Sequence, residues 1–199
     1  MEKEISFDKI AEILFKKIKI PDKKLRENYF VIFVGIPGSG KTTLARWLSK
    51  KYSFCRVSTD RIKNYLRKHN YLFEVKDLFK IQRKIFYKLL EKKVNIVSDS
   101  NSDLRKYRDS LKHLSKKFKY TSIIIYLKIS IENAYTHLLN KKKIRKSKTL
   151  YKKLIRFHKT LEEPKEAIKI YVNNDRRDVL KQVDNEICKI INKSEGKKL

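Results

Sequence analysis

Short apolar runs recur along the chain and predict strands. Residues 29–34 form a continuous apolar run, as expected for a strand that is buried on both faces. Residues 120–127 are rich in β-branched and aromatic side chains and give the clearest strand pattern. The remaining predicted strands cover residues 53–58, 94–97 and 167–172.

Segments with apolar residues at helical spacing separate these strands. In residues 74–92 the spacing of Leu78, Ile81, Ile85 and Leu89 places all four on one face. Further predicted helices cover residues 42–51, a segment beginning at Asp60, and residues 104–117, 131–140, 150–161 and 179–191. Strands that alternate with helices in this way predict an α/β fold, a three-layer α/β/α sandwich with a mainly parallel five-stranded sheet.

An amphipathic helix is predicted ahead of the first strand, over residues 6–19, with Pro21 ending it. We divide the chain into this N-terminal segment, residues 1–26, and one domain, residues 27–199. The helix either packs on the domain or lies on a membrane or partner surface, and we favour packing.

The composition is that of a globular protein, with 41% hydrophobic and 11% aromatic residues. No apolar run approaches the ~20 residues that a transmembrane helix needs, and the N-terminus lacks a signal-peptide pattern. We therefore expect a cytoplasmic protein. Cys55 and Cys188 have no metal-ligand spacing, and we expect two buried, reduced thiols.

The net charge is +29, from 51 Lys and Arg against 22 Asp and Glu. A surface of this kind attracts polyanions, and we predict a nucleic-acid partner, RNA in preference to DNA. A compositional bias toward lysine would give the same charge, so both explanations stay open. The oligomeric state is left open as well.

Residues 35–42 read G-I-P-G-S-G-K-T, a full match to the phosphate-binding pattern G-x-x-x-x-G-K-[ST] between a strand and a helix. The chain has 4 glycines, and three of them lie in this loop. Backbone amides of such a loop surround phosphate oxygens at the positive end of the following helix. The predicted ATP-binding residues are Gly35, Ile36, Pro37, Gly38, Ser39, Gly40, Lys41, Thr42 and Thr43.

Two of these side chains have separate roles in the prediction. Lys41 places a charge on the β- and γ-phosphates, and the Thr42 hydroxyl binds Mg²⁺. ATP and Mg²⁺ are therefore the predicted cofactors.

Acidic residues follow two other predicted strands, at the edge where open α/β sheets bind ligands. Asp60 is a candidate catalytic base for an attacking hydroxyl, although capping the next helix is an alternative role. Asp99 is the predicted partner of Mg²⁺. Residues 141–150 are basic and predict a lid, in which Arg145 is the candidate catalytic cation. Its neighbours Lys141, Lys142, Lys143 and Lys146 stay open as alternatives, and so does a plain solvated charge run.

With these motifs together, the chain resembles P-loop kinases of the polynucleotide kinase and zeta-toxin type, the AAA_33 group. The resemblance spans residues 29–172 and includes G-I-P-G-S-G-K-T-T, V-S-T-D-R-I-K, I-V-S-D-S-N followed by Arg105 and Arg108, and R-F-H-K-T-L-E-E-P. It implies a parallel five-stranded core, ATP and Mg²⁺, and transfer to a hydroxyl. It also implies that Asp60 is the general base and that Lys63 and Asn101 contact the acceptor. Lys63 departs from the arginine that these kinases have at this position.

The function predicted from the sequence is an ATP-dependent kinase that transfers the γ-phosphoryl group to a hydroxyl of a nucleic acid or a tRNA-linked acceptor. Two alternatives remain: a kinase of small metabolites, and an ATP-gated binding module without phosphoryl transfer.

Overall fold

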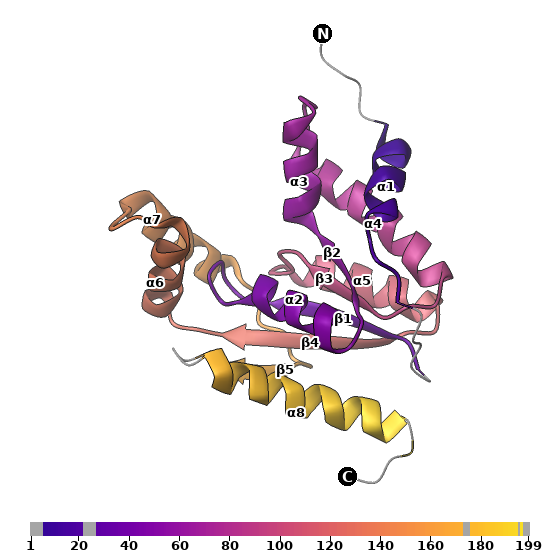
Figure 1. The fold of residues 1–199 in the computed structure, drawn as a ribbon. Coiled ribbons are helices and arrows are strands. Elements are labelled where there is room, and N and C mark those ends of the chain that lie inside the picture. Colours follow the sequence, from indigo (N-terminus) through magenta and orange to yellow (C-terminus); the bar gives the residue numbers. More distant parts are fainter. Residues whose placement is uncertain (1–5, 22–26, 173–175, 195, 197–199) are drawn as a thin grey trace.

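A parallel sheet forms the centre of the molecule (Figure 1). The structure is a computed structural model that describes residues 6–21, 27–172, 176–194 and 196. In these residues five strands pair in the order β2-β3-β1-β4-β5, every pair parallel. The strands are β1 (Tyr29–Val34), β2 (Cys55–Ser58), β3 (Ile96–Asp99), β4 (Thr121–Lys128) and β5 (Ile168–Tyr171).

Helices cover both faces of this sheet, which confirms the predicted three-layer α/β/α fold. The described residues form α1 (Phe7–Lys16), α2 (Lys41–Lys51), α3 (Thr59–Lys68), α4 (Val75–Glu91), α5 (Arg105–Lys117), α6 (Ile131–Lys142), α7 (Lys148–Thr160) and α8 (Arg176–Ser194).

The central strand β1 shows why its sequence is continuously apolar. Phe30 and Ile32 pack on one face with residues of α1, α3, α4 and α5, whereas Val31 and Phe33 pack on the other with α2 and α8. All six residues of β1 are buried. Because alternate side chains enter two different hydrophobic clusters, neither face of the strand can be polar.

The N-terminal helix α1 packs against α4, as the packing interpretation predicted. Ile10 and Ala11 are buried in the same cluster as the core residues of α4. Lys84 pairs with Asp8 at 2.7 Å, along the same interface. The division after residue 26 stays a prediction, since residues 22–26 lie outside the described part. No helix in the described residues combines the length and apolarity needed to cross a bilayer.

Helices α6 and α7 form an arm at the end of the sheet toward which β4 points (Figure 1). The arm has a small hydrophobic cluster of its own, in which Ala134 and Leu154 pack with Ile36 and Ile129. Residues 143–147 link the two helices. We call this unit the α6–α7 arm.

Helix α2 carries Trp47, the one tryptophan of the chain. Its ring is half-buried and meets the ring of Tyr52 edge-on, with the centroids 5.7 Å apart. Trp47 packs at the margin of the cluster between α2, α8 and the sheet.

The third strand begins two residues later than predicted and includes Asp99. Asn95 explains the shift, because its Oδ1 accepts a hydrogen bond from the Tyr29 amide at 2.7 Å. Residue 95 thus anchors the start of β1, and regular pairing begins at Ile96. The first helix also ends earlier than predicted, at Lys16.

The two cysteines differ in environment. Both are free thiols, but only Cys55 is buried, and Cys188 is half-buried. The expectation of two buried thiols is therefore wrong for Cys188. It lies on α8, where its Sγ is 2.9 Å from the Tyr52 hydroxyl at the edge of the helix interface.

Candidate active site

The phosphate-binding pattern forms the loop between β1 and α2. Gly38 has φ +90°, and a Cβ at this position would lie 2.4 Å from the Ala134 carbonyl oxygen in α6. A side chain therefore meets both an unfavourable backbone conformation and a steric clash. The loop closes tightly against the arm because this residue is glycine.

Lys41 is the first residue of α2 and is buried below the loop, with 8% of its surface exposed. Its Nζ donates hydrogen bonds to the carbonyl oxygens of Gly35 at 2.5 Å and Ile36 at 3.0 Å. Burial lowers the pKa of the Lys41 ammonium to about 8, although the nearby carboxylates of Asp99, Asp103 and Asp60 act to raise it. The ammonium thus lies at the N-terminal end of α2, where main-chain carbonyl oxygens accept its hydrogen bonds.

Thr42 and Asp99 meet beside this lysine. Thr42 Oγ1 donates to Asp99 Oδ1 at 2.9 Å. Arg56 Nε donates to the other carboxylate oxygen, Oδ2, at 2.8 Å, and Arg56 Nη2 also contacts it. The carboxylate is fixed from two sides, and one side of it is next to the loop.

A hydroxyl and a carboxylate in this arrangement fit the oxygen ligands that Mg²⁺ prefers. Thr42 and Asp99 are the residues that would hold the ion. The described residues contain no group of three or more His, Cys, Asp or Glu placed to bind a metal.

One cavity of about 700 Å³ contains both the loop and the predicted acceptor residues. Residues 37–43 form one side of it, and Asp60, Lys63 and Asn101 also line it. Asp60 is exposed and lies in the first turn of α3, whose N-cap is Ser58. The ends of β2 and β3 thus bring the predicted acceptor residues to the same cavity as the phosphate loop.

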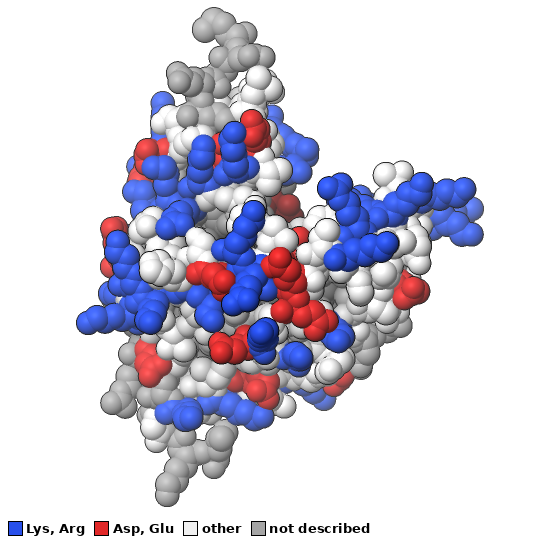
Figure 2. Space-filling view, turned by 180° about the vertical axis from the view of Figure 1, so that it is seen from behind, with Lys and Arg blue, Asp and Glu red and all other residues white. Residues whose placement is uncertain are grey.

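The arm supplies side chains to this cavity both from the predicted lid and from α7. The cavity is lined by Lys141, Lys142 and Lys153. Arg145 is exposed in the 143–147 link and is not among the residues that line the cavity. Figure 2 shows that Lys and Arg dominate the surface of the arm, at the right of this view, while acidic residues are interspersed elsewhere on this face. The catalytic role of Arg145 stays a prediction.

A family model described as an AAA domain, AAA_33, matches residues 30–164. The chain belongs to the AAA_33 family. A comparison with curated proteins finds no match.

Solved structures share the fold of this AAA_33 domain. A gluconokinase from Sinorhizobium meliloti 1021 has a TM-score of 0.57 at 13% identity, covering 86% of this chain and 97% of that chain. The APS kinase CysC of Mycobacterium tuberculosis, in complex with AMPPNP and APS, has a TM-score of 0.56 at 15% identity, covering 81% and 96%. A structure from the PezAT toxin–antitoxin system of Streptococcus pneumoniae has a TM-score of 0.58 at 15% identity, covering 97% of both chains. At these identities the likeness shows the fold, that of P-loop kinases.

Arg56 and His137 are among the residues of this site that were missed from the sequence. Arg56 had a detectable signal, since a charged residue within a strand buried on both faces needs a partner. His137 had none: its Nδ1 lies 3.1 Å from the Gly38 carbonyl oxygen only because α6 folds back onto the loop.

Proposed function

We propose that this AAA_33 protein is an ATP-dependent phosphotransferase that moves the γ-phosphoryl group onto a hydroxyl of a small metabolite. The observation that carries the proposal is the single cavity that contains the phosphate loop, with Lys41 and Thr42, together with Asp60. A nucleotide bound on the loop and a hydroxyl held at Asp60 would share one space, as direct transfer requires.

The loop side of the cavity is suited to the triphosphate. Backbone amides of residues 38–43 and the Lys41 ammonium would bind the phosphate oxygens. Bound at Thr42 and Asp99, Mg²⁺ would offset negative charge on the β- and γ-phosphates. Arg56 keeps the Asp99 carboxylate oriented toward Thr42 through its own bonds to Oδ2.

The apolar part of the cavity lining would accept the nucleobase. It is formed by α7 and the start of α8 with the end of β5, through Leu154, Phe157, Val172, Val179 and Leu180. Apolar side chains of this kind typically contact the flat faces of ligands, while a few polar groups fix their orientation.

The acceptor side rests on Asp60. An exposed carboxylate at the end of β2 would accept the proton of the attacking hydroxyl. Lys63 and Asn101, which line the same cavity, would orient the acceptor. The arm, with Lys141 and Lys142, would exclude water during transfer.

The nature of the acceptor differs from the first expectation. A nucleic-acid or tRNA-linked acceptor has no support in the comparisons, and the small-metabolite alternative fits better, since two solved structures with this fold are a gluconokinase and an APS kinase. The subtype related to polynucleotide kinases and zeta toxins remains a hypothesis that rests on the sequence motifs alone. The mixed distribution of charge in Figure 2 is consistent with compositional bias as the source of much of the net charge.

The proposal is tested by substituting Asp60→Asn. We expect transfer from labelled ATP to a panel of hydroxylated metabolites to fall by about 10²–10⁴-fold, because the carboxylate base is lost. ATP affinity, measured by calorimetry, should stay close to that of the wild type because Asp60 is on the acceptor side.

Asp109→Asn is the matched control, since Asp109 is exposed on α5 and does not line the nucleotide cavity. Transfer to RNA or DNA but to no metabolite would restore the first expectation. ATP binding without Asp60-dependent transfer to any acceptor would favour the ATP-gated binding module.

A further inference from the structure

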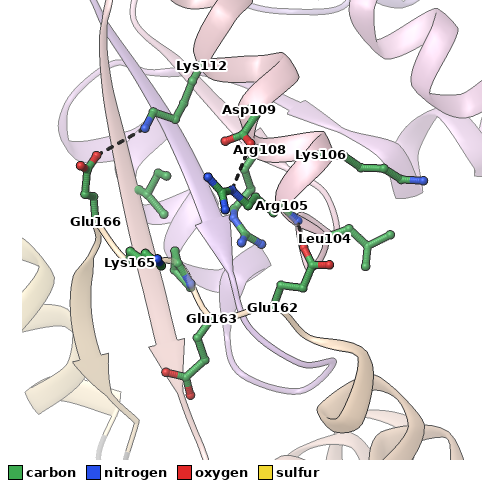
Figure 3. Close-up of a pocket in the computed structure, with 12 residues that line it drawn as sticks. Leu104, Arg105, Lys106, Arg108, Asp109, Lys112, Glu162, Glu163, Lys165 and Glu166 are labelled. Carbon is green, nitrogen blue, oxygen red and sulfur yellow. Dashed lines mark hydrogen bonds and ion pairs between the residues drawn. The ribbon is translucent and has the colours of Figure 1, made fainter.

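The N-terminus of α5 is capped by a residue from a distant part of the chain. Its N-cap residue is Leu104, which has no side-chain acceptor, and the Arg105 amide instead donates to Glu162 Oε2. Figure 3 shows Glu162 pointing at this helix end in the wall of a second cavity, of about 800 Å³. Three other helices, α1, α6 and α7, are capped locally by Ser6, Ser130 and Ser147.

A second hydrogen bond joins Glu162 to the loop before α5. The Glu162 amide donates to the Asp103 carbonyl oxygen at 3.1 Å. The same oxygen accepts from Arg108 Nη1 at 2.7 Å, and Arg108 Nη1 also donates to the Ser102 carbonyl oxygen at 2.9 Å. Arg108 is buried, with 3% exposed. Residues 102–105 are therefore held between α5 and Glu162.

Both segments joined by this contact, the loop before α5 and the end of α7, are adjacent in sequence to residues that line the nucleotide cavity. Residues 100–104 follow Asp99 at the end of β3, and Asn101 in this loop lines the cavity. Glu162 follows α7, which ends at Thr160 and supplies Lys153 and Phe157 to the same cavity. Glu162 thus connects the last helix of the arm to the loop that carries Asn101.

We propose that Glu162 is a positioning residue that couples the α6–α7 arm to the loop of residues 100–104. When the arm settles on a nucleotide, this contact moves the loop with it and sets Asn101 for the acceptor. Glu162 itself lies outside the lining of the nucleotide cavity. The inference rests on the proposed function, because it requires a nucleotide that the arm contacts.

The two hydrogen bonds of Glu162 differ in kind: the Arg105 amide at the start of α5 donates to its carboxylate, whereas its own main-chain amide donates to the Asp103 carbonyl, so only the first depends on the glutamate side chain. A carboxylate at a helix N-terminus is favoured by the helix dipole, and its bond to an amide is charge-assisted. The neighbouring Glu163 is different, because it contacts Tyr126 at 3.1 Å and Lys128 at 3.5 Å on β4. Figure 3 shows the two carboxylates pointing in different directions. Glu163→Ala is therefore a matched control from the same segment.

The experiment follows amide hydrogen exchange with and without Mg·AMPPNP, which binds without transfer. In the wild type we expect the nucleotide to slow exchange both in the arm and in residues 100–105. In Glu162→Ala the slowing should remain in the arm and be lost in residues 100–105. Glu163→Ala should behave as the wild type, and Glu162→Gln, which keeps an acceptor oxygen, should retain most of the slowing.

The double variant Glu162→Ala/Leu104→Ser distinguishes two roles of Glu162, that of a helix cap alone and that of a link between the arm and the loop. A serine at the N-cap supplies a local acceptor and should restore thermal stability lost in Glu162→Ala. Coupling should stay lost, because the serine restores the cap but not the side-chain contact of Glu162 with Arg105, and the remaining main-chain bond from residue 162 to the Asp103 carbonyl is not expected to carry the response. Recovery of the nucleotide response in residues 100–105 by this serine would overturn the proposal, and so would an unchanged response in Glu162→Ala.

The wild type alone also tests the proposal. If nucleotide slows exchange in the arm while residues 100–105 do not respond, the coupling is disproved even where Glu162→Ala fails to fold. If nucleotide slows exchange nowhere in the wild type, the proposed function fails first and the coupling fails with it.

Discussion

The ammonium of Lys41 lies in an unusual place for a charge, buried under the loop that is proposed to bind the triphosphate. Its hydrogen-bond acceptors are the main-chain carbonyls of Gly35 and Ile36. Removing an ammonium from water disfavours its charged form, and the pKa falls to about 8. Phosphate oxygens would favour the charged form again, so nucleotide binding and protonation of Lys41 are linked.

This linkage predicts a pH dependence of ATP affinity. Well below the pKa of about 8, Lys41 is already protonated and the affinity should be constant. Above it, binding must take up a proton, and the affinity should fall by up to about tenfold per pH unit until the higher pKa of the complex is reached. Calorimetry between about pH 7 and about pH 9 in buffers of different ionisation enthalpy measures both effects.

Lys41→Ala serves as the reference for this experiment. Its affinity should be low and independent of pH over the same range, because the titrating ammonium is gone. A wild-type affinity that does not change above pH 8 would show that Lys41 keeps its proton throughout.

At the residue scale, the sequence predicted those parts of the site that local motifs encode. The spacing of Lys41 and Thr42 after the glycines singled out the loop, and Asp99 was proposed because it follows a predicted strand. The structure brings Thr42 and Asp99 into contact, and their roles stay predictions. Arg56 was missed because its contact with Asp99 depends on the pairing of β2 with β3, in which Ser58 lies opposite Asp99. Strand register of this kind is a property of the folded sheet.

At the element scale, the phosphate loop and α6 press directly against each other. The Gly38 carbonyl oxygen lies 3.1 Å from His137 Nδ1, and the Ala134 carbonyl stands where a Cβ of residue 38 would be. The loop therefore contacts the arm through its main chain.

Comparing Gly38→Ala with Gly40→Ala should separate the energetic cost of the contact with α6 from the cost of the left-handed backbone conformation. Gly40 has a similar φ of +98° but open space around its Cβ position. We expect Gly40→Ala to cost about 1–2 kcal/mol of unfolding free energy, from the left-handed conformation. Gly38→Ala should cost at least about 1 kcal/mol more, because α6 must also be displaced. Denaturant unfolding of both variants makes the comparison, and equal losses would mean that α6 yields without strain.

The positions of elements were harder to predict than their existence. Each predicted strand and helix is present, because the apolar patterns of strands such as β4 are long and regular. The direction of the α6–α7 arm depends instead on a small cluster around Ala134 and Leu154 and on the fit at Gly38. No local pattern contains that information, so Arg145 was chosen among the cations of the predicted lid for the chemistry of its guanidinium and not for its position.

At the scale of the whole molecule, α1 is part of the same hydrophobic core as the sheet. Ile10→Ala should therefore lower the free energy of unfolding of the whole domain by about 2–5 kcal/mol. Ile144, which is 40% exposed in the link of the arm, gives a matched control, and Ile144→Ala should change stability by no more than about 0.5 kcal/mol. An Ile10→Ala variant that unfolds like the wild type would indicate that α1 is an appendage.

The fold class could be predicted from the alternation of strands and helices. The class of binding partner could not be predicted from the size of the net charge. The value of +29 sums over the whole chain, but binding depends on where charges lie. Figure 2 shows basic residues spread over the whole of that face, the arm included, with acidic residues interspersed among them. The sum suggested a polyanionic partner that the comparisons do not support.

The single indole of the chain gives the molecule its own optical reporter. Trp47 lies on the helix that begins at the phosphate loop, and it is half-buried against Tyr52. Its emission will shift to longer wavelength when water reaches the ring. Fluorescence during denaturation therefore reports on the unfolding around α2 without an attached dye. The unfolding of each variant can be followed by the fluorescence of Trp47.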